Sequence, residues 1–68
     1  MRQVIIRPGE DGYFVAECLS LPGCISQGET REQAIENIRE AIIVYIEALE
    51  MDGLPVPDEP FDALLVAV

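Results

Sequence analysis

The side chains that could act as nucleophiles are two cysteines and two serines. Cys18 and Cys24 have apolar neighbours, and Ser20 and Ser26 follow each of them two residues later. The chain contains no histidine and no lysine, so the usual general base and the usual activating amine are missing. A reactive cysteine also needs a lowered pKa, which acidic neighbours oppose. The cysteine spacing matches no zinc signature, and the sequence therefore predicts two small buried thiols and no catalytic residues.

Carboxylates are the most abundant groups that could do chemistry. Thirteen acidic residues against four basic ones give a net charge of -9. A cluster of carboxylates can hold divalent metal ions, but here they recur along one face of a predicted helix, opposite its apolar stripe: Glu32, Glu36, Glu40, Glu47 and Glu50. A row of acids on an open face is typical of solvated surface. We therefore expect no metal site, no cofactor and no enzymatic activity.

The same acidic face is the candidate for contact with a partner. Glu36 and Glu40 are like charges at i,i+4 spacing, an arrangement that costs helix stability. Helical geometry places Ile43 among these carboxylates, with Glu47 one turn further on, and an apolar residue inside a polar rim is typical of a protein contact. Two interpretations stay open: a solvated face, or a surface for a basic partner. The predicted contact residues are Glu36, Glu40, Ile43 and Glu47.

The overall charge and the hydropathy exclude other classes of partner. Affinity for nucleic acids rests largely on Lys and Arg neutralising phosphates, so this acidic chain is expected not to bind them directly. Its longest apolar run is interrupted by Glu47 and Glu50, and no stretch approaches the roughly 20 apolar residues that span a bilayer. The apolar run near the start is also too short for a signal peptide. We expect a cytoplasmic protein that does not bind membranes.

These residues are positioned by a short series of predicted elements. Alternating or β-branched stretches predict strands, and Pro8-Gly9-Glu10-Asp11-Gly12 predicts a turn between the first two. The second strand should direct Phe14, Ala16 and Cys18 to one face of the sheet. The expected elements are strands at 3–7, 13–18 and 24–27, a helix at 31–51, and a last strand within 61–68.

The helix carries the strongest local signals. Thr30 is a good N-cap, and Gln33 three residues later completes a capping-box pattern. Apolar residues then recur at intervals of three and four, which draws one stripe for packing on a sheet: Ala34, Ile35, Ile38, Ala41, Ile42, Tyr45, Ile46 and Leu49. Gly53, Pro55 and Pro57 prevent the helix from continuing. The order β-β-β-α-β predicts a single α+β domain over residues 1–68, a two-layer sandwich with one helix on one face of an antiparallel sheet.

The C-terminal segment predicts self-association. A chain of 68 residues is marginal as an isolated domain, yet half of its residues are hydrophobic. A strand that is apolar on both faces must be buried on both or pair with another chain. We expect a dimer or a tetramer, without deciding between them, held by Leu64, Leu65, Val66 and Val68.

An ordered set of small motifs covers almost the whole chain. It begins with Gly12-Tyr13-Phe14-Val15-Ala16 and Leu21-Pro22-Gly23-Cys24, continues through the helix start, and ends at Gly53, Pro55 and Pro57. Together these motifs resemble the HicB family of antitoxins and their stand-alone relatives. The family motif residues are Gly12, Tyr13, Leu21, Pro22, Gly23, Gly28, Thr30, Ala34 and Ala41.

The resemblance implies both a fold and a function. The implied fold is a partial ribonuclease H-like sandwich, without nuclease activity. The implied function is to bind and mask HicA, a small basic ribonuclease toxin that cleaves mRNA. Many relatives add a DNA-binding segment that is not found in this sequence. That difference leaves an alternative open, an orphan HicB-like protein that acts as a homo-oligomeric adaptor or regulator without a toxin.

Overall fold

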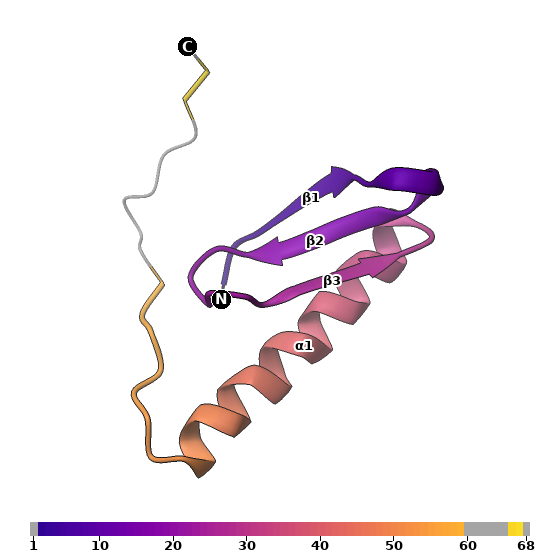
Figure 1. The fold of residues 1–68 in the computed structure, drawn as a ribbon. Coiled ribbons are helices and arrows are strands. Elements are labelled where there is room, and N and C mark those ends of the chain that lie inside the picture. Colours follow the sequence, from indigo (N-terminus) through magenta and orange to yellow (C-terminus); the bar gives the residue numbers. More distant parts are fainter. Residues whose placement is uncertain (1, 60–65, 68) are drawn as a thin grey trace.

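The computed structural model describes residues 2–59 and 66–67, and it contains three strands, a short 3-10 turn and one long helix (Figure 1). The elements follow the predicted order to within one residue at each boundary. They are β1 (Val4–Pro8), η1 (Glu10–Gly12), β2 (Phe14–Cys18), β3 (Ile25–Gly28) and α1 (Arg31–Met51). The predicted α+β class, with one helix on one face of an antiparallel sheet, is confirmed.

The three strands form one antiparallel sheet in the order β1-β2-β3. Ala16 in the central strand lies opposite Ile6 of β1 and Ser26 of β3. This register turns Ala16 and Cys18 towards the helix, where both are fully buried. The predicted alternation of β2 is therefore correct, because a pleated strand sends successive side chains to opposite faces.

The core lies between the sheet and the apolar stripe of α1. Ala34 and Ile38 are the buried residues of the helix, and Val4, Ile6 and Phe14 pack at the edge of the same cluster. Helix α1 packs mainly against β3 and β2 and only slightly against β1. Because of this offset, the helix does not cover β1 along much of its length. The offset also determines where the surfaces described below lie.

The start of α1 forms the predicted N-cap. The hydroxyl oxygen of Thr30 accepts a hydrogen bond of 3.0 Å from the backbone N–H of Gln33. The side-chain oxygen of Gln33 in turn accepts from the backbone N–H of Glu29, at 2.6 Å. The return bond thus reaches one residue further back than in the usual capping box, and two N–H groups at the helix start are satisfied.

The loop between β2 and β3 is folded inward around Leu21, which is completely buried. The backbone N–H of Leu21 donates to the carbonyl of Cys18 at 3.2 Å, and the N–H of Cys24 donates to the carbonyl of Leu21 at 3.0 Å. The Tyr45 hydroxyl of the helix donates to the Pro22 carbonyl at 2.7 Å. Gly23 has a φ of 80°, the left-handed region that favours glycine. The loop therefore fills part of the hydrophobic core with Leu21, and we call it the plug loop.

After α1 the chain turns back towards the start of β1. Residues 54–59 have no regular secondary structure and run beside the sheet layer (Figure 1). The expected last strand falls largely on residues 60–65 and 68, which lie outside the described residues. Val66 and Ala67 are described, and they belong to no strand.

Candidate partner-binding surfaces

The acidic ridge of α1, formed by Glu36, Glu40 and Glu47, is exposed as its sequence pattern requires. Ile43 lies among them with 53% of its surface exposed. The only ion pair that any of them makes within the described residues is a 3.1 Å contact between Glu36 Oε1 and Arg39 Nη1. Within the described residues, Glu40 and Glu47 therefore have no cationic partner. The ridge presents these carboxylates to solvent together with the apolar side chain of Ile43.

The ridge runs between two shallow grooves rather than into a single pocket. Glu40 lines the groove beside β3, together with Ile25, Val44 and Tyr45. Ile43 instead lines a groove on the other side of the helix, beside β1. The four predicted contact residues therefore share an exposed face but do not converge on one hollow. A flat partner surface suits this arrangement better than an inserted side chain.

The groove beside β1 is mainly apolar. Its walls come from α1 and from the start of β1, and among the described residues its charged ones are Arg2 and Arg39. The lining residues are Arg2, Val4, Ile35, Ile38, Arg39, Ile42, Ile43 and Ile46. Sequence periodicity did not reveal this groove, because it results from the offset of the helix towards β3 and β2. We name it the β1 groove.

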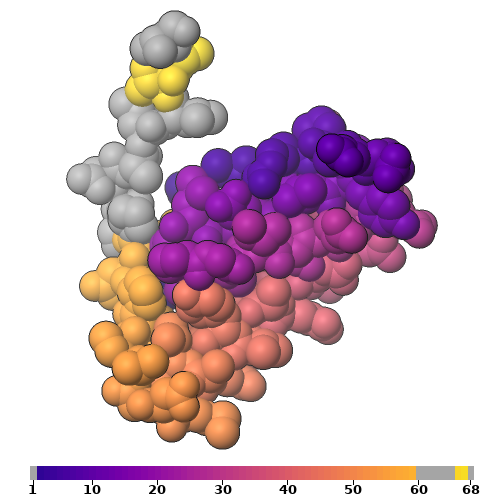
Figure 2. Space-filling model, viewed as in Figure 1, coloured from indigo at the N-terminus to yellow at the C-terminus, as the bar shows by residue number. Residues whose placement is uncertain are grey.

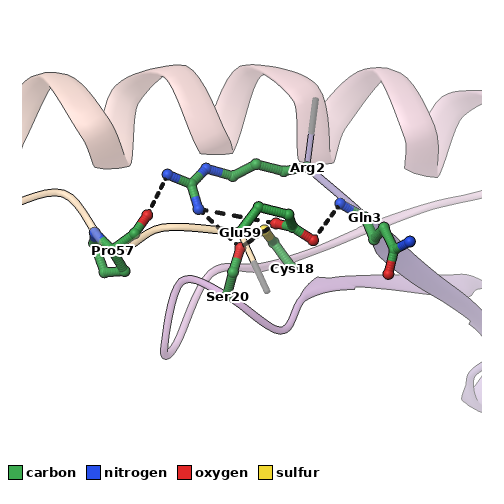
Figure 3. Close-up of polar contacts among 6 residues, drawn as sticks. All are labelled: Arg2, Gln3, Cys18, Ser20, Pro57 and Glu59. Atoms are coloured by element: carbon green, nitrogen blue, oxygen red, sulfur yellow. Dashed lines mark hydrogen bonds and ion pairs between the residues drawn. The ribbon is translucent and has the colours of Figure 1, made fainter. Parts of the chain in front are cut away.

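A polar cluster joins the N-terminal segment, the β2–β3 loop and the segment after the helix (Figure 3). Glu59 accepts hydrogen bonds from the Ser20 hydroxyl at 2.7 Å and from the Gln3 backbone N–H at 3.0 Å. Arg2 donates from Nη1 to Ser20 Oγ at 2.9 Å and from Nη2 to the Pro57 carbonyl at 2.6 Å. Because Ser20 gives its only proton to Glu59, the Cys18 thiol 3.4 Å away donates to Ser20.

The cluster lowers the pKa of Glu59. The hydrogen bond from the Ser20 hydroxyl is the largest cause, followed by the Gln3 N–H, and the Arg2 charge adds to it. Each of these favours the ionised carboxylate. The sequence considered Ser20 only as a candidate nucleophile and did not single out Arg2 or Glu59, since only the fold brings the three side chains together.

Replacing Glu59 by glutamine should lower stability at pH 7 and leave it unchanged in strong acid. A carboxyl whose pKa is lower in the folded state stabilises the fold above its unfolded pKa, and that contribution is lost as pH falls through the folded pKa. Urea unfolding of the Glu59→Gln chain and the parent at pH 7, 5 and 3 measures this. Glu10→Gln controls for the loss of one negative charge. An equal effect of Glu59→Gln at all three values would contradict the prediction.

The two cysteines are free and buried, as predicted. Burial raises the pKa of the Cys24 thiol, and the nearby Cys18 raises it further. A raised pKa reduces the thiolate fraction and with it the reactivity. Among residues 2–59 and 66–67, no three acidic, histidine or cysteine side chains gather as a metal site would require.

The motif residues build the fold rather than a site. Leu21, Pro22 and Gly23 form the plug loop, and Thr30 caps the helix. Gly28 and Ala34 mark the point where β3 meets the start of α1, and both are buried. Gly12 and Tyr13 lie between β1 and β2, and Ala41 packs against the core. Together, these positions specify one packing of helix on sheet.

That packing agrees with the fold that the sequence resemblance implies. A comparison with family models identifies the family. Residues 3–65 match the model described as HicB_like antitoxin of bacterial toxin-antitoxin system. The chain belongs to the HicB-like antitoxin family. A role in a toxin-antitoxin system follows in general terms from this membership.

Individual proteins are similar to this HicB-like chain over most of its length. A UPF0150 protein of Thermoplasma acidophilum is 43% identical over 63 residues, which cover 93% of this chain and 91% of the relative. A UPF0150 protein of a Synechocystis strain is 50% identical over 56 residues, covering 82% and 71%. One of Helicobacter pylori is 48% identical over 50 residues, covering 74% and 68%. No solved structure matches the chain significantly.

The remaining predicted contact residues concern self-association. Leu64, Leu65 and Val68 lie outside the described residues, while Val66 is 60% exposed.

Within the described part of the chain, α1 is too polar to cross a bilayer, and no other helix there is long enough.

Proposed function

We propose that this HicB-like protein neutralises a small basic HicA-like ribonuclease by binding it and masking its RNA-binding or catalytic surface. The observation that carries the proposal is the exposed acidic ridge of α1 on a chain of net charge -9. The proposal includes a cytoplasmic site of action, no enzymatic activity and no direct binding of nucleic acid.

Electrostatics supports the ridge as the contact. A protein that binds RNA presents arginines and lysines to phosphates, and the same surface attracts a row of carboxylates. Complementary charge speeds association and fixes orientation more than it adds raw affinity. Ile43 would supply the apolar contact that a charged rim surrounds.

Reversing two charges of the ridge should weaken the toxin complex. We expect Glu40→Lys with Glu47→Lys to reduce affinity by about tenfold or more, because like charges placed opposite each other cost several kcal/mol. The partner to test is any small basic protein found to be encoded beside this gene, and calorimetric titration at low and high salt measures binding. The reversal should also weaken the dependence of affinity on salt, since fewer attractive pairs remain to be screened.

A matched control separates the ridge from net charge. Glu10→Lys with Asp58→Lys changes the charge by the same amount at exposed positions away from the ridge. A much smaller loss in this control supports a local contact. Unchanged affinity in the ridge variant would remove Glu40 and Glu47 from the interface, and equal losses in both variants would leave only a non-specific effect of charge.

A second candidate function is that of an orphan adaptor that assembles with itself and has no toxin. The apolar β1 groove and the exposed Val66 favour it, because solvent-exposed apolar surface marks interaction sites. The two functions differ in one simple observation. A neighbouring gene for a small basic protein that co-purifies with this chain favours the antitoxin, and the absence of any such partner favours the adaptor.

A further inference from the structure

Strand β3 lies at one edge of the sheet, and its register shows which of its backbone groups face outward. The Cys18 N–H donates to the Cys24 carbonyl at 3.0 Å, so these residues form a hydrogen-bonded pair just before β3. Hydrogen-bonded and non-hydrogen-bonded pairs alternate along an antiparallel ladder. Ser26 is therefore bonded to β2, whereas Ile25 and Gln27 direct their N–H and C=O groups away from it.

One of these outward groups already accepts a hydrogen bond from the helix. The Asn37 side chain donates from Nδ2 to the Gln27 carbonyl at 2.7 Å. Within the described residues, the Ile25 N–H, the Ile25 C=O and the Gln27 N–H have no hydrogen-bond partner. Such a row is a template for a further strand, and exposed edges usually carry charge or proline against it. Strand β3 contains neither.

An apolar groove lies directly beside this edge, and we call it the β3 groove. Its apolar walls include Ile25 from β3 and Ala41, Val44 and Tyr45 from α1. Ile25 is 52% exposed and Val44 is 64% exposed, so both side chains are open to solvent. Figure 2 shows the strand layer lying on the helix, and β3 is the strand that packs most extensively against α1. The edge and the groove therefore form one continuous surface.

The charges of the two grooves differ in sign. Among the described residues that line the β3 groove, Glu40 is the charged one, and it belongs to the acidic ridge of α1. The β1 groove instead contains Arg2 and Arg39. A basic partner is therefore attracted to the β3 groove and repelled from the β1 groove. Two copies of this chain, each with a net charge of -9, repel each other at the same place.

The spacing of the groove residues specifies the segment that fits. Glu40 and Val44 lie about one helical turn apart, roughly 6 Å along the axis. Alternate residues of an extended chain project to the same face about 7 Å apart. A segment paired with β3 therefore places a basic side chain against Glu40 and, two positions away, an apolar side chain against Val44.

We propose that the β3 edge and the β3 groove receive an extended segment of the basic partner, which pairs with β3 as a further strand of the sheet. Backbone hydrogen bonds to Ile25 and Gln27 supply affinity, while Glu40 and Val44 select a basic and an apolar residue two positions apart. This binding mode rests on the proposed function, which supplies the basic partner. It adds a defined site, because the acidic ridge alone requires only opposite charge.

Amide hydrogen exchange tests the pairing, measured by NMR on the labelled chain, free and in complex with a small basic protein found to be encoded beside its gene. We expect the Ile25 and Gln27 amides to exchange about tenfold more slowly, or less, in the complex, because both become bonded donors. The amides of Val4 and Ile6, which face away from β2 at the other edge, should not change. A complex without slower exchange at Ile25 and Gln27 overturns the site and leaves the proposed function standing. The absence of any complex overturns both.

A synthetic probe tests the same surface without the partner. It is a capped peptide with threonine at every second position and with lysine and valine alternating between the threonines. Its match carries glutamate in place of lysine. We expect only the lysine peptide to slow exchange at Ile25 and Gln27. Equal effects of the two peptides, or none from either, would overturn the selection of a basic strand. Slow exchange in the chain alone, with a doubled mass in light scattering, would assign the edge to a second copy instead.

Two substitutions at one position separate backbone pairing from side-chain contact. Gln27→Pro removes an outward N–H without breaking a hydrogen bond to β2, and it should weaken the partner complex by about three- to tenfold. Gln27→Val keeps the N–H and removes only the side-chain amide, so the affinity should stay nearly unchanged. Circular dichroism confirms that both chains fold, and calorimetric titration measures binding. Equal affinities of the two folded variants would overturn the pairing with β3.

Discussion

Replacing Leu21 by alanine is expected to destabilise the protein strongly. Leu21 is completely buried and is among the largest fully buried side chains. Removing its three outer carbons loses their transfer energy and leaves a cavity, which costs about 2–5 kcal/mol for a core leucine. A domain of this length has a total stability of roughly 3–10 kcal/mol. The substitution therefore removes a large share of the stability.

Urea unfolding followed by circular dichroism measures this loss, and the chain contains a matched control. Leu19 lies two residues earlier in the same connection between β2 and β3, with 63% of its surface exposed. Leu19→Ala makes the same chemical change but should alter stability by no more than about 0.5 kcal/mol. Similar effects of the two substitutions would show that the loop does not plug the core.

Replacing Gly28 by alanine is expected to be at least as damaging, although it adds only one carbon. A Cβ at position 28 would lie 2.5 Å from the backbone nitrogen of Ala34 and 2.8 Å from the carbonyl carbon of Gln33. Neither atom can move without shifting the first turn of α1 against β3. Overpacking of this kind costs about 1–3 kcal/mol, and backbone contacts belong at or above the upper end.

The Gly28→Ala variant is measured by thermal and urea unfolding against Gly23→Ala. Gly23 has a φ of 80° but no atom within 4 Å of its would-be Cβ. Its substitution therefore introduces only backbone strain, about 1–2 kcal/mol for a left-handed residue. The expected order of stability is parent, Gly23→Ala, then Gly28→Ala. A Gly28→Ala chain as stable as Gly23→Ala would mean that the contact between β3 and α1 opens at little cost.

Both substitutions fall on family motif residues, and both should act through the fold. In both variants, toxin binding should therefore be lost under the same conditions in which the domain unfolds. Reversal of Glu40 and Glu47 should instead leave the fold intact, since both side chains are exposed. Measuring stability beside affinity in each variant separates the residues that build the domain from those that meet a partner.

The types and bounds of the first three strands and of the helix could be predicted from sequence to within one residue. Local chemistry governs them: the alternation of β2 directs Ala16 and Cys18 inward, and the Thr30 cap sets the first turn of α1. The exposure of Glu36 and Glu40 followed in the same way, because a helical period separates an apolar stripe from a polar face.

The tertiary structure alone decided where these faces lie relative to one another. The helix packs towards β3 and β2, and this offset places Glu40 in one groove and Ile43 in another, although the two residues share a helix face. The cluster of Arg2, Ser20 and Glu59 joins side chains that are 18 to 57 positions apart in the sequence. No local sequence pattern encodes such contacts, because they depend on how the rigid elements pack in three dimensions.

The absence of histidine and lysine, the acidic helix face and the apolar C-terminal segment are properties of the sequence by itself. The β1 groove arose only from the packing of α1 towards β3 and β2, which no local sequence pattern specifies. The sequence therefore determined what the surfaces are made of. The fold determined how those surfaces lie relative to one another within the described residues, because that depends on how the helix packs on the sheet.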